Sequence, residues 1–213
     1  MMSLFIDTSN FRLIVGVVDE SRNIICTYHD DALKSDLSVK VLDVIKECID
    51  KSNIRPNDID KIYIVNGPGS FTGVRIGVTI AKVFAWSLNK KVIPISSLEV
   101  LASTDSDKDY VVSMIDARRD CVYAGIYDKD LNSYMSDKYI SLEDLNNKIP
   151  KNSLIVSDDD INMDNITKPN INILKVINKH KEDEGVNPHE LVPVYLKITE
   201  AEANLKSKND KRD

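Results

Sequence analysis

The chain is poor in the residues that hold metal ions or build disulfide frameworks. Its 213 residues include only three cysteines, far apart and with no CxxC pair, and three histidines with no HxxxH or HExxH pattern. These spacings exclude zinc-knuckle and zinc-protease motifs, and they predict buried free thiols in a reducing compartment. We therefore expect no bound metal. The residues concerned are Cys26, Cys48, Cys121, His29, His180 and His189.

Long apolar runs and an excess of positive charge are also missing. No segment approaches the roughly 20 apolar residues of a membrane span, and the N-terminal MMSLFIDTSNF lacks the basic and long apolar regions of a signal peptide. The formal net charge of -6 excludes a broad basic surface for gripping nucleic acid. We expect a cytoplasmic protein that makes no membrane contact and meets any RNA mainly through a partner.

The first half of the sequence alternates strand and helix patterns. Three short apolar runs, broken at Asn10 and at Ser21-Arg22-Asn23, predict a meander of strands. An amphipathic helix at about 38–51, a strand at KIYIV, a helix at about 72–88 and a strand at KVIPIS follow. The order βββαβαβ therefore accounts for the chain as far as residue 97.

The second half begins as a partial repeat of the first. The polar segment STDSDKD divides an N-terminal lobe, 1–103, from a smaller C-terminal lobe, 104–205. The second lobe opens with MIDARRDCVYAGIYDK, which repeats the strand pattern of FIDTSNFRLIVGVVDE. We expect further strands at SLIVS (153–157) and INILKVI (171–177), and a disordered tail at 206–213 because it contains no apolar residue. The repeat predicts an α/β protein of two related lobes, the second reduced.

The stretch NGPGSFTGVRIG lies between a strand and a helix, an arrangement that often binds phosphate. Its spacing is GxGxxxG, which fits neither the dinucleotide motif GxGxxG nor a Walker loop ending in GK[ST]. We therefore expect Gly67, Gly69 and Gly73 to shape the backbone so that the helix packs tightly on the sheet. Ser70 or Thr72 is the expected helix cap.

The helix after this stretch is apolar on almost every side. Its polar residues fall on one narrow stripe, whereas a surface helix has an apolar face only somewhat over 100° wide. One side must cover the sheet. The other covers either the helix at 38–51 or a partner chain, and both hypotheses stay open. The candidate interface residues are Val41, Ile45, Arg75, Val78, Thr79, Lys82 and Trp86.

Asp7 and Asp116 each end a strand and are the sharpest candidates for acid and base chemistry. The alternative is that each carboxylate accepts backbone N–H bonds and braces a hairpin turn. We favour bracing because no nucleophile or metal-binding motif accompanies the two aspartates.

Several segments together resemble the TsaB (YeaZ) family: IDTS, NGPGSFTGVRIG with its apolar helix, SSLE at 96–99, and IDARRDCVYAGIYD. The segment PVYLKITEAE resembles the closing motif of that family. The resemblance implies the two-lobed, ribonuclease H-like fold shared by actin, sugar kinases and heat-shock chaperones. It also implies a non-catalytic subunit in bacterial synthesis of N6-threonylcarbamoyladenosine at tRNA position 37. The implied partners are TsaD, which holds metal and nucleotide, and the ATPase TsaE, with a homodimer formed in isolation through the same two helices.

The residues of the second lobe indicate whether this chain could bind a nucleotide itself. A nucleotide site in this fold needs tight glycine turns in both lobes, but the second lobe has Arg118 and Arg119 at that place. We expect no cofactor, and we keep Asp7, Arg118 and Arg119 as a possible residual anion site. The competing hypotheses are an ATP-dependent kinase or metal-dependent hydrolase that uses Asp7 and Asp116, and a self-sufficient homodimer with an unrelated binding role.

Overall fold

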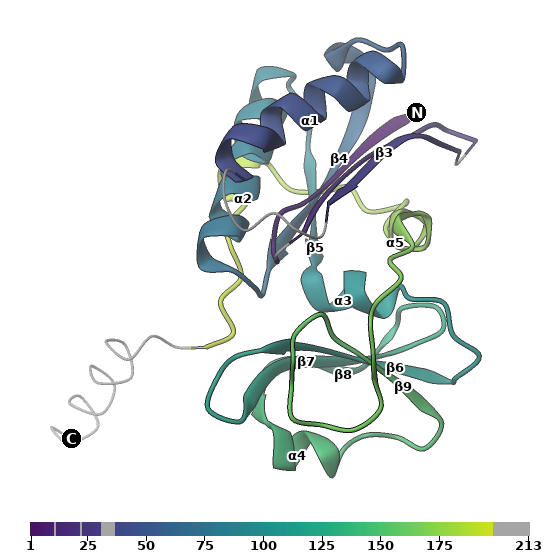
Figure 1. The fold of residues 1–213 in the computed structure, drawn as a ribbon. Helices are drawn as coiled ribbons and strands as arrows, with labels where there is room; N and C mark the ends of the chain where they lie inside the picture. Colours follow the sequence, from purple (N-terminus) through teal and green to yellow (C-terminus); the bar gives the residue numbers. More distant parts are fainter. Residues whose placement is uncertain (11, 22, 31–36, 198–213) are drawn as a thin grey trace, which may run out of the picture.

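The computed structural model describes residues 1–10, 12–21, 23–30 and 37–197. Arg22, which was expected in a turn, and the tail 206–213 lie outside the described residues. The protein has two lobes, each built on a five-stranded sheet, and the first lobe carries the longer helices (Figure 1).

The first lobe has the predicted order βββαβαβ and the sheet order β3-β2-β1-β4-β5. Strand β1 is antiparallel to β2 and parallel to β4, because β1 and β2 are joined by a hairpin while β4 is reached through helix α1. Helices α1 and α2 cover the face of this sheet that points away from the second lobe (Figure 1). The elements are β1 (Met2–Asp7), β2 (Leu13–Val18), β3 (Ile24–Asp30), α1 (Leu37–Lys51), η1 (Pro56–Asp58), β4 (Ile59–Gly67), α2 (Phe71–Ser87), β5 (Val92–Ser96) and α3 (Ser97–Ala102).

The second lobe repeats this strand order completely. Its sheet runs β10-β9-β6-β7-β8, which is the order of the first sheet when β6 is matched to β1. The reduction lies in the helices, because residues 157–165 connect β9 to β10 without a helix where α2 stands in the first lobe. The elements are β6 (Tyr110–Asp116), β7 (Cys121–Asp128), β8 (Ser133–Ser141), α4 (Leu142–Asn146), β9 (Ser153–Val156), β10 (Ile166–Thr167), α5 (Ile173–Lys179) and η2 (Pro188–Glu190).

One predicted strand is wrong. The segment 171–177 forms the start of helix α5, capped by the Asn172 side chain, which accepts a hydrogen bond from the Lys175 backbone N–H at 3.1 Å. Ile173, Val176 and Ile177 are buried at the spacing of a helix face. Seven residues were too few for the sequence pattern to separate a short helix from a strand.

A second core lies between the two sheets, where α3 and α5 pack against the inner face of each. After α5 the chain returns to the first lobe, where Val186 pairs with Val92 and the Val194 N–H donates to the Asn66 carbonyl at 2.8 Å. Helix α3 ends at Ala102 and strand β6 begins at Tyr110. The segment up to residue 197, however, lies against the first lobe as well as the second.

Candidate functional site

The glycine stretch brings helix α2 into direct contact with the end of β1. A Cβ on Gly73 would lie 2.1 Å from the Thr8 carbonyl oxygen, and a Cβ on Gly77 would lie 2.2 Å from Thr8 Oγ1. Thr8 Oγ1 donates to the Gly73 carbonyl at 2.8 Å, and the Ser70 N–H donates to the Ser9 carbonyl at 2.6 Å. The first two turns of α2 therefore pack directly on Thr8, on its backbone at Gly73 and on its side chain at Gly77, at distances that only glycine permits.

Two other residues of the stretch cap the helix and let the C-terminal segment pack closely on the loop. Ser70 is the N-cap, and its hydroxyl accepts a hydrogen bond from the Gly73 N–H at 3.2 Å. Gly67 has a φ of +118°, and a Cβ there would lie 2.6 Å from the Val194 carbonyl oxygen. A side chain at position 67 would thus push away the segment that closes over this loop.

The inner faces of α1 and α2 are occupied by the core of the first lobe. Val41, Ile45 and Val78 are only 0%, 3% and 3% exposed, because they pack in the core that the two helices form with one face of the sheet. The prediction that these three residues face a partner is therefore wrong. The sequence showed that α2 is apolar all round but could not show which side meets the sheet.

The outer faces of the two helices carry large exposed apolar side chains. Leu42 on α1 is 54% exposed, and Val83 and Trp86 on α2 are 60% and 63% exposed. Thr79 is exposed on the same side of α2. We call this surface the outer face; its residues are Val39, Leu42, Thr79, Val83 and Trp86. Of these, the sequence singled out only Thr79 and Trp86, although the spacing 79, 83, 86 marks one side of a helix.

Two of the predicted polar interface residues make contacts within the chain. Lys82 is half-buried, and its ammonium donates to the Leu191 carbonyl at 3.0 Å and to the His189 carbonyl at 3.4 Å. Arg75 is exposed, and its guanidinium lies 3.7 Å from the centroid of the Phe71 ring while its Nε donates to the Tyr195 hydroxyl at 2.7 Å. Both side chains therefore hold the C-terminal segment along α2.

A cleft of about 570 Å³ separates the start of α2 from the second lobe. Its lining includes Arg118 and Lys197 as well as Asp116 and Asp159, so it presents charge of both signs. Of the three residues of the possible anion site, only Arg118 lines this cleft. The lining residues are Asn10, Gly69, Ser70, Phe71, Thr72, Ile115, Asp116, Ala117, Arg118, Tyr123, Asp159 and Lys197.

Asp7 and Asp116 brace equivalent turns in the two lobes. The Asp7 carboxylate accepts hydrogen bonds from the Ser9 N–H at 2.8 Å and the Ser9 hydroxyl at 2.6 Å, and it is buried. Burial raises the pKa of Asp7 in spite of the opposing effect of these bonds. The Asp116 carboxylate accepts the Arg118 N–H at 2.8 Å. The bracing hypothesis is confirmed for both aspartates.

The turn after Asp116 has an unusual backbone. Arg118, Arg119 and Asp120 have φ values of 64°, 55° and 56°, in the left-handed region that side chains other than glycine seldom adopt. The Asp116 N–H donates to Asp159 Oδ2 at 2.7 Å, which ties the turn to the segment after β9. Burial raises the pKa of Asp159. The turn therefore presents arginine side chains where a close approach of phosphate to backbone would require glycine.

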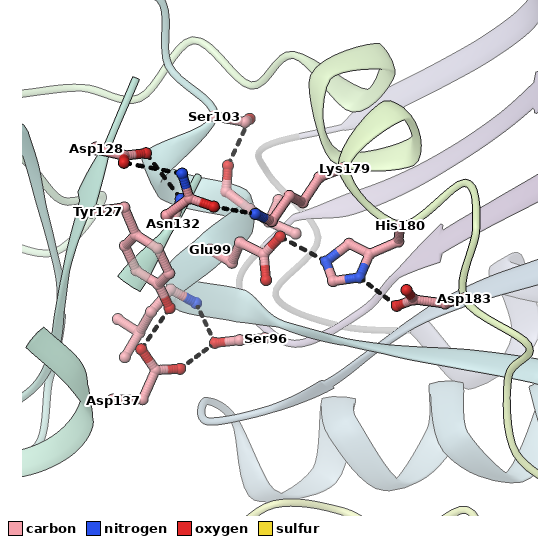
Figure 2. Close-up of polar contacts among 12 residues, drawn as sticks. Ser96, Glu99, Ser103, Tyr127, Asp128, Asn132, Asp137, Lys179, His180 and Asp183 are labelled. Carbon is pink, nitrogen blue, oxygen red and sulfur yellow. Dashed lines mark hydrogen bonds and ion pairs between the residues drawn. The ribbon is translucent and has the colours of Figure 1, made fainter. Parts of the chain in front are cut away.

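A polar network that no sequence pattern indicated lies between the lobes (Figure 2). The Asp137 carboxylate on β8 accepts hydrogen bonds from the Tyr127 hydroxyl on β7 and from the Ser96 hydroxyl at the end of β5. Glu99 on α3 contacts His180 beside α5, with 2.6 Å between Glu99 Oε1 and His180 Nε2. These pairs are 10 to 81 residues apart in the chain, so no local pattern could have predicted them.

Within residues 1–10, 12–21, 23–30 and 37–197, no three His, Cys, Asp or Glu side chains are grouped as metal ligands. In the same part of the chain, no helix has both the length and the apolar character needed to cross a bilayer.

Comparison with known proteins places the chain among tRNA-modification proteins. The family model described as TsaD, tRNA N6-adenosine threonylcarbamoyltransferase, matches residues 32–190. The Bacillus subtilis (strain 168) tRNA threonylcarbamoyladenosine biosynthesis protein TsaB is 35% identical, over 95% of this chain and 97% of its own length. The protein of that name from Escherichia coli (strain K12) is 32% identical over 62% of this chain and 57% of its own length. The solved structure of YeaZ from Pseudomonas aeruginosa has the same fold, with a TM-score of 0.76 at 22% identity over 91% of this chain and all of that one.

Proposed function

This chain belongs to the TsaB family of tRNA threonylcarbamoyladenosine biosynthesis proteins, and from that membership we propose that it is a cytoplasmic, non-catalytic subunit that binds and activates a TsaD homologue. The outer face of α1 and α2 is the proposed binding surface. In this proposal the tRNA and the TsaE homologue contact the assembled pair rather than this chain alone.

The observation that carries the proposal is the apolar character of the outer face. Leu42, Val83 and Trp86 are each more than half exposed on two neighbouring helices. Grouped apolar side chains on a soluble protein mark an interaction site more often than they serve the free monomer. Tryptophan is also enriched among the residues that dominate binding energies at protein interfaces.

The similarity to the TsaD family model favours a partner of related fold. The match covers residues 32–190, which include both α1 and α2. Two related chains can pair through equivalent helices about a pseudo-twofold axis, and two copies of one chain can pair through the same surface about a true twofold axis. We therefore propose that the free chain forms a homodimer through the outer face and that the TsaD homologue displaces the second copy.

The cleft and the two turns that end β1 and β6 support a non-catalytic role. Arg118 occupies the turn where a phosphate would need bare backbone, and the carboxylates of Asp7 and Asp116 already accept hydrogen bonds within their turns. The net charge of -6 further favours contact with tRNA through the partner.

The test is a reconstituted transfer reaction with a TsaD homologue, a TsaE homologue, threonylcarbamoyl-adenylate and an ANN-reading tRNA. Adding this chain should raise the yield of modified adenosine at least tenfold, and Val83→Glu should bring the yield back to the level without the chain. Tyr134→Glu is the matched control, because Tyr134 is equally exposed, at 60%, but lies on β8 of the second lobe. Modification by the chain without the TsaD homologue would contradict the proposal.

A kinase or hydrolase of the same fold is the alternative, because the cleft volume of about 570 Å³ lies in the range of small-ligand sites. Calorimetric titration of the isolated chain with ATP and Mg²⁺ separates the two functions. Sub-millimolar binding would favour the enzyme, whereas the subunit hypothesis predicts no heat above that of dilution.

A further inference from the structure

Two cysteines that are distant in sequence lie in contact within the first lobe. Cys26 is on β3 and Cys48 is on the inner face of α1, and their Sγ atoms are 2.9 Å apart. A disulfide bond is about 2.05 Å long, so a movement of less than about 1 Å would join the two sulfurs. Cys121 lies on β7 of the second lobe, apart from this pair.

The two thiols differ in access. β3 is the edge strand of its sheet, next to β2, and Cys26 on it is half-buried. Cys48 is 1% exposed. Burial, with a smaller contribution from the neighbouring Cys26, raises the pKa of the Cys48 thiol to about 12, so Cys48 is protonated at neutral pH. An oxidant from solution therefore meets Cys26 first.

We propose that Cys26 and Cys48 are a redox-responsive pair that reacts with a low-molecular-weight disulfide of the oxidised glutathione class to form an internal disulfide between β3 and α1. The Cys26 thiolate attacks one sulfur of the small disulfide, forming a mixed disulfide and releasing one thiolate. The Cys48 sulfur then attacks the Cys26 sulfur, the second small thiolate leaves, and the Cys48 proton passes to it. The two protein thiols are oxidised and the small disulfide is reduced to two thiols. This proposal does not depend on the proposed function.

The disulfide would link α1 covalently to the edge strand of the sheet. In the reduced protein α1 is held on β2 and β3 by packing of side chains such as Val41 and Val44, and the Cys48 thiol also lies 3.9 Å from the Val15 carbonyl on β2. A cross-link between positions 26 and 48 removes chain entropy from the unfolded state. For a protein of this size we expect the thermal midpoint of the oxidised form to exceed that of the reduced form by roughly 5–10 °C.

The experiment uses the full-length chain, reduced, freed of reductant and then incubated with oxidised glutathione. Peptide mapping by mass spectrometry without reduction should recover one peptide pair linking Cys26 to Cys48, and dithiothreitol should abolish it. Cys121→Ser should give the same map. Cys48→Ser should stop at a glutathione adduct on Cys26, and Cys26→Ser should leave Cys48 unmodified.

Three results would overturn the proposal. One is a wild-type chain that accumulates only the glutathione adduct on Cys26, and another is a cross-link that includes Cys121 or joins two chains. The third is a chain that keeps three free thiols after prolonged incubation. Because the wild-type map decides each case, the outcome does not depend on whether the serine variants fold.

Discussion

His180 lies between two carboxylates that come from different parts of the chain. Its Nε2 is 2.6 Å from Glu99 Oε1 and its Nδ1 is 2.7 Å from Asp183 Oδ2 (Figure 2). Lys61 of β4 also reaches this corner, where its ammonium donates to the backbone carbonyls of Lys181 and Asp183. Burial alone would lower the pKa of His180, but the bonds and charges of Glu99 and Asp183 outweigh it, so the pKa is raised.

His180→Gln should therefore destabilise the protein in a pH-dependent way. A raised folded-state pKa means that the contribution of the imidazolium is complete below the unfolded pKa of about 6.5 and is lost as pH rises through the folded pKa. We expect the variant to lose about 2 kcal/mol of unfolding free energy at about pH 5.5 and much less at about pH 9. Urea denaturation across this range measures the difference. His189→Gln, an exposed histidine in η2, is the control and should show no such trend.

Alanine substitutions at Gly73 and Gly77 should differ in whether a second change at Thr8 rescues them. Alanine in place of a helical glycine ordinarily gains about 1 kcal/mol, but here each Cβ would collide with Thr8. We expect Gly73→Ala and Gly77→Ala each to lose about 2 kcal/mol of unfolding free energy. Adding Thr8→Ala should rescue Gly77→Ala, which meets the Thr8 hydroxyl, and should not rescue Gly73→Ala, which meets a backbone oxygen. A double-mutant cycle that shows equal rescue would contradict this account.

At the scale of the helices, α2 shows which of its apolar residues cover the core of its own lobe and which remain exposed. It is both a core helix, through Val78 and Ala81, and a surface helix with exposed apolar residues, through Val83 and Trp86. The glycines at 73 and 77 fix which side meets the sheet. The polar stripe of α2 is too narrow to predict how the helix is rotated about its axis relative to the sheet. The buried and exposed positions could therefore be assigned only from the structure.

Substitutions on the two sides of α2 should therefore have opposite effects. Val78→Glu buries a charge in the core and should cost more than about 3 kcal/mol of unfolding free energy. Val83→Glu should change that free energy by less than about 0.5 kcal/mol and should shift the free chain from dimer toward monomer. Urea denaturation and sedimentation velocity measure the two quantities. A Val83→Glu variant that unfolds like Val78→Glu would show that position 83 is core.

Much of the fold could be predicted, and the failures have physical causes. Alternating apolar residues and turn residues were enough for the strands of the first lobe, since each hairpin or crossover is local in sequence. Helix α5 was missed because a run of seven residues fits a strand as well as a helix. The contact of Cys26 with Cys48, and of Ser96 with Asp137, depends on how distant segments pack, and the sequence carries no local signal of it.

At the scale of the whole molecule, polar side-chain contacts join the two lobes. Arg12 of the first lobe pairs with Asp158 of the second, and Asp137 of the second lobe accepts a hydrogen bond from the Ser96 hydroxyl of the first. The outer face lies on the far side of the first sheet, away from these contacts (Figure 1). A partner can therefore cover α1 and α2 without disturbing the contacts between the lobes.

The most direct test of the central claim is sedimentation velocity of this chain mixed with a purified TsaD homologue. We predict that the homodimer is replaced by a one-to-one heterodimer with the wild-type chain and with Tyr134→Glu, and that Val83→Glu weakens the heterodimer at least tenfold. A homodimer that persists unchanged beside the TsaD homologue, or a Val83→Glu variant that binds as tightly as the wild type, would contradict the assignment of the outer face.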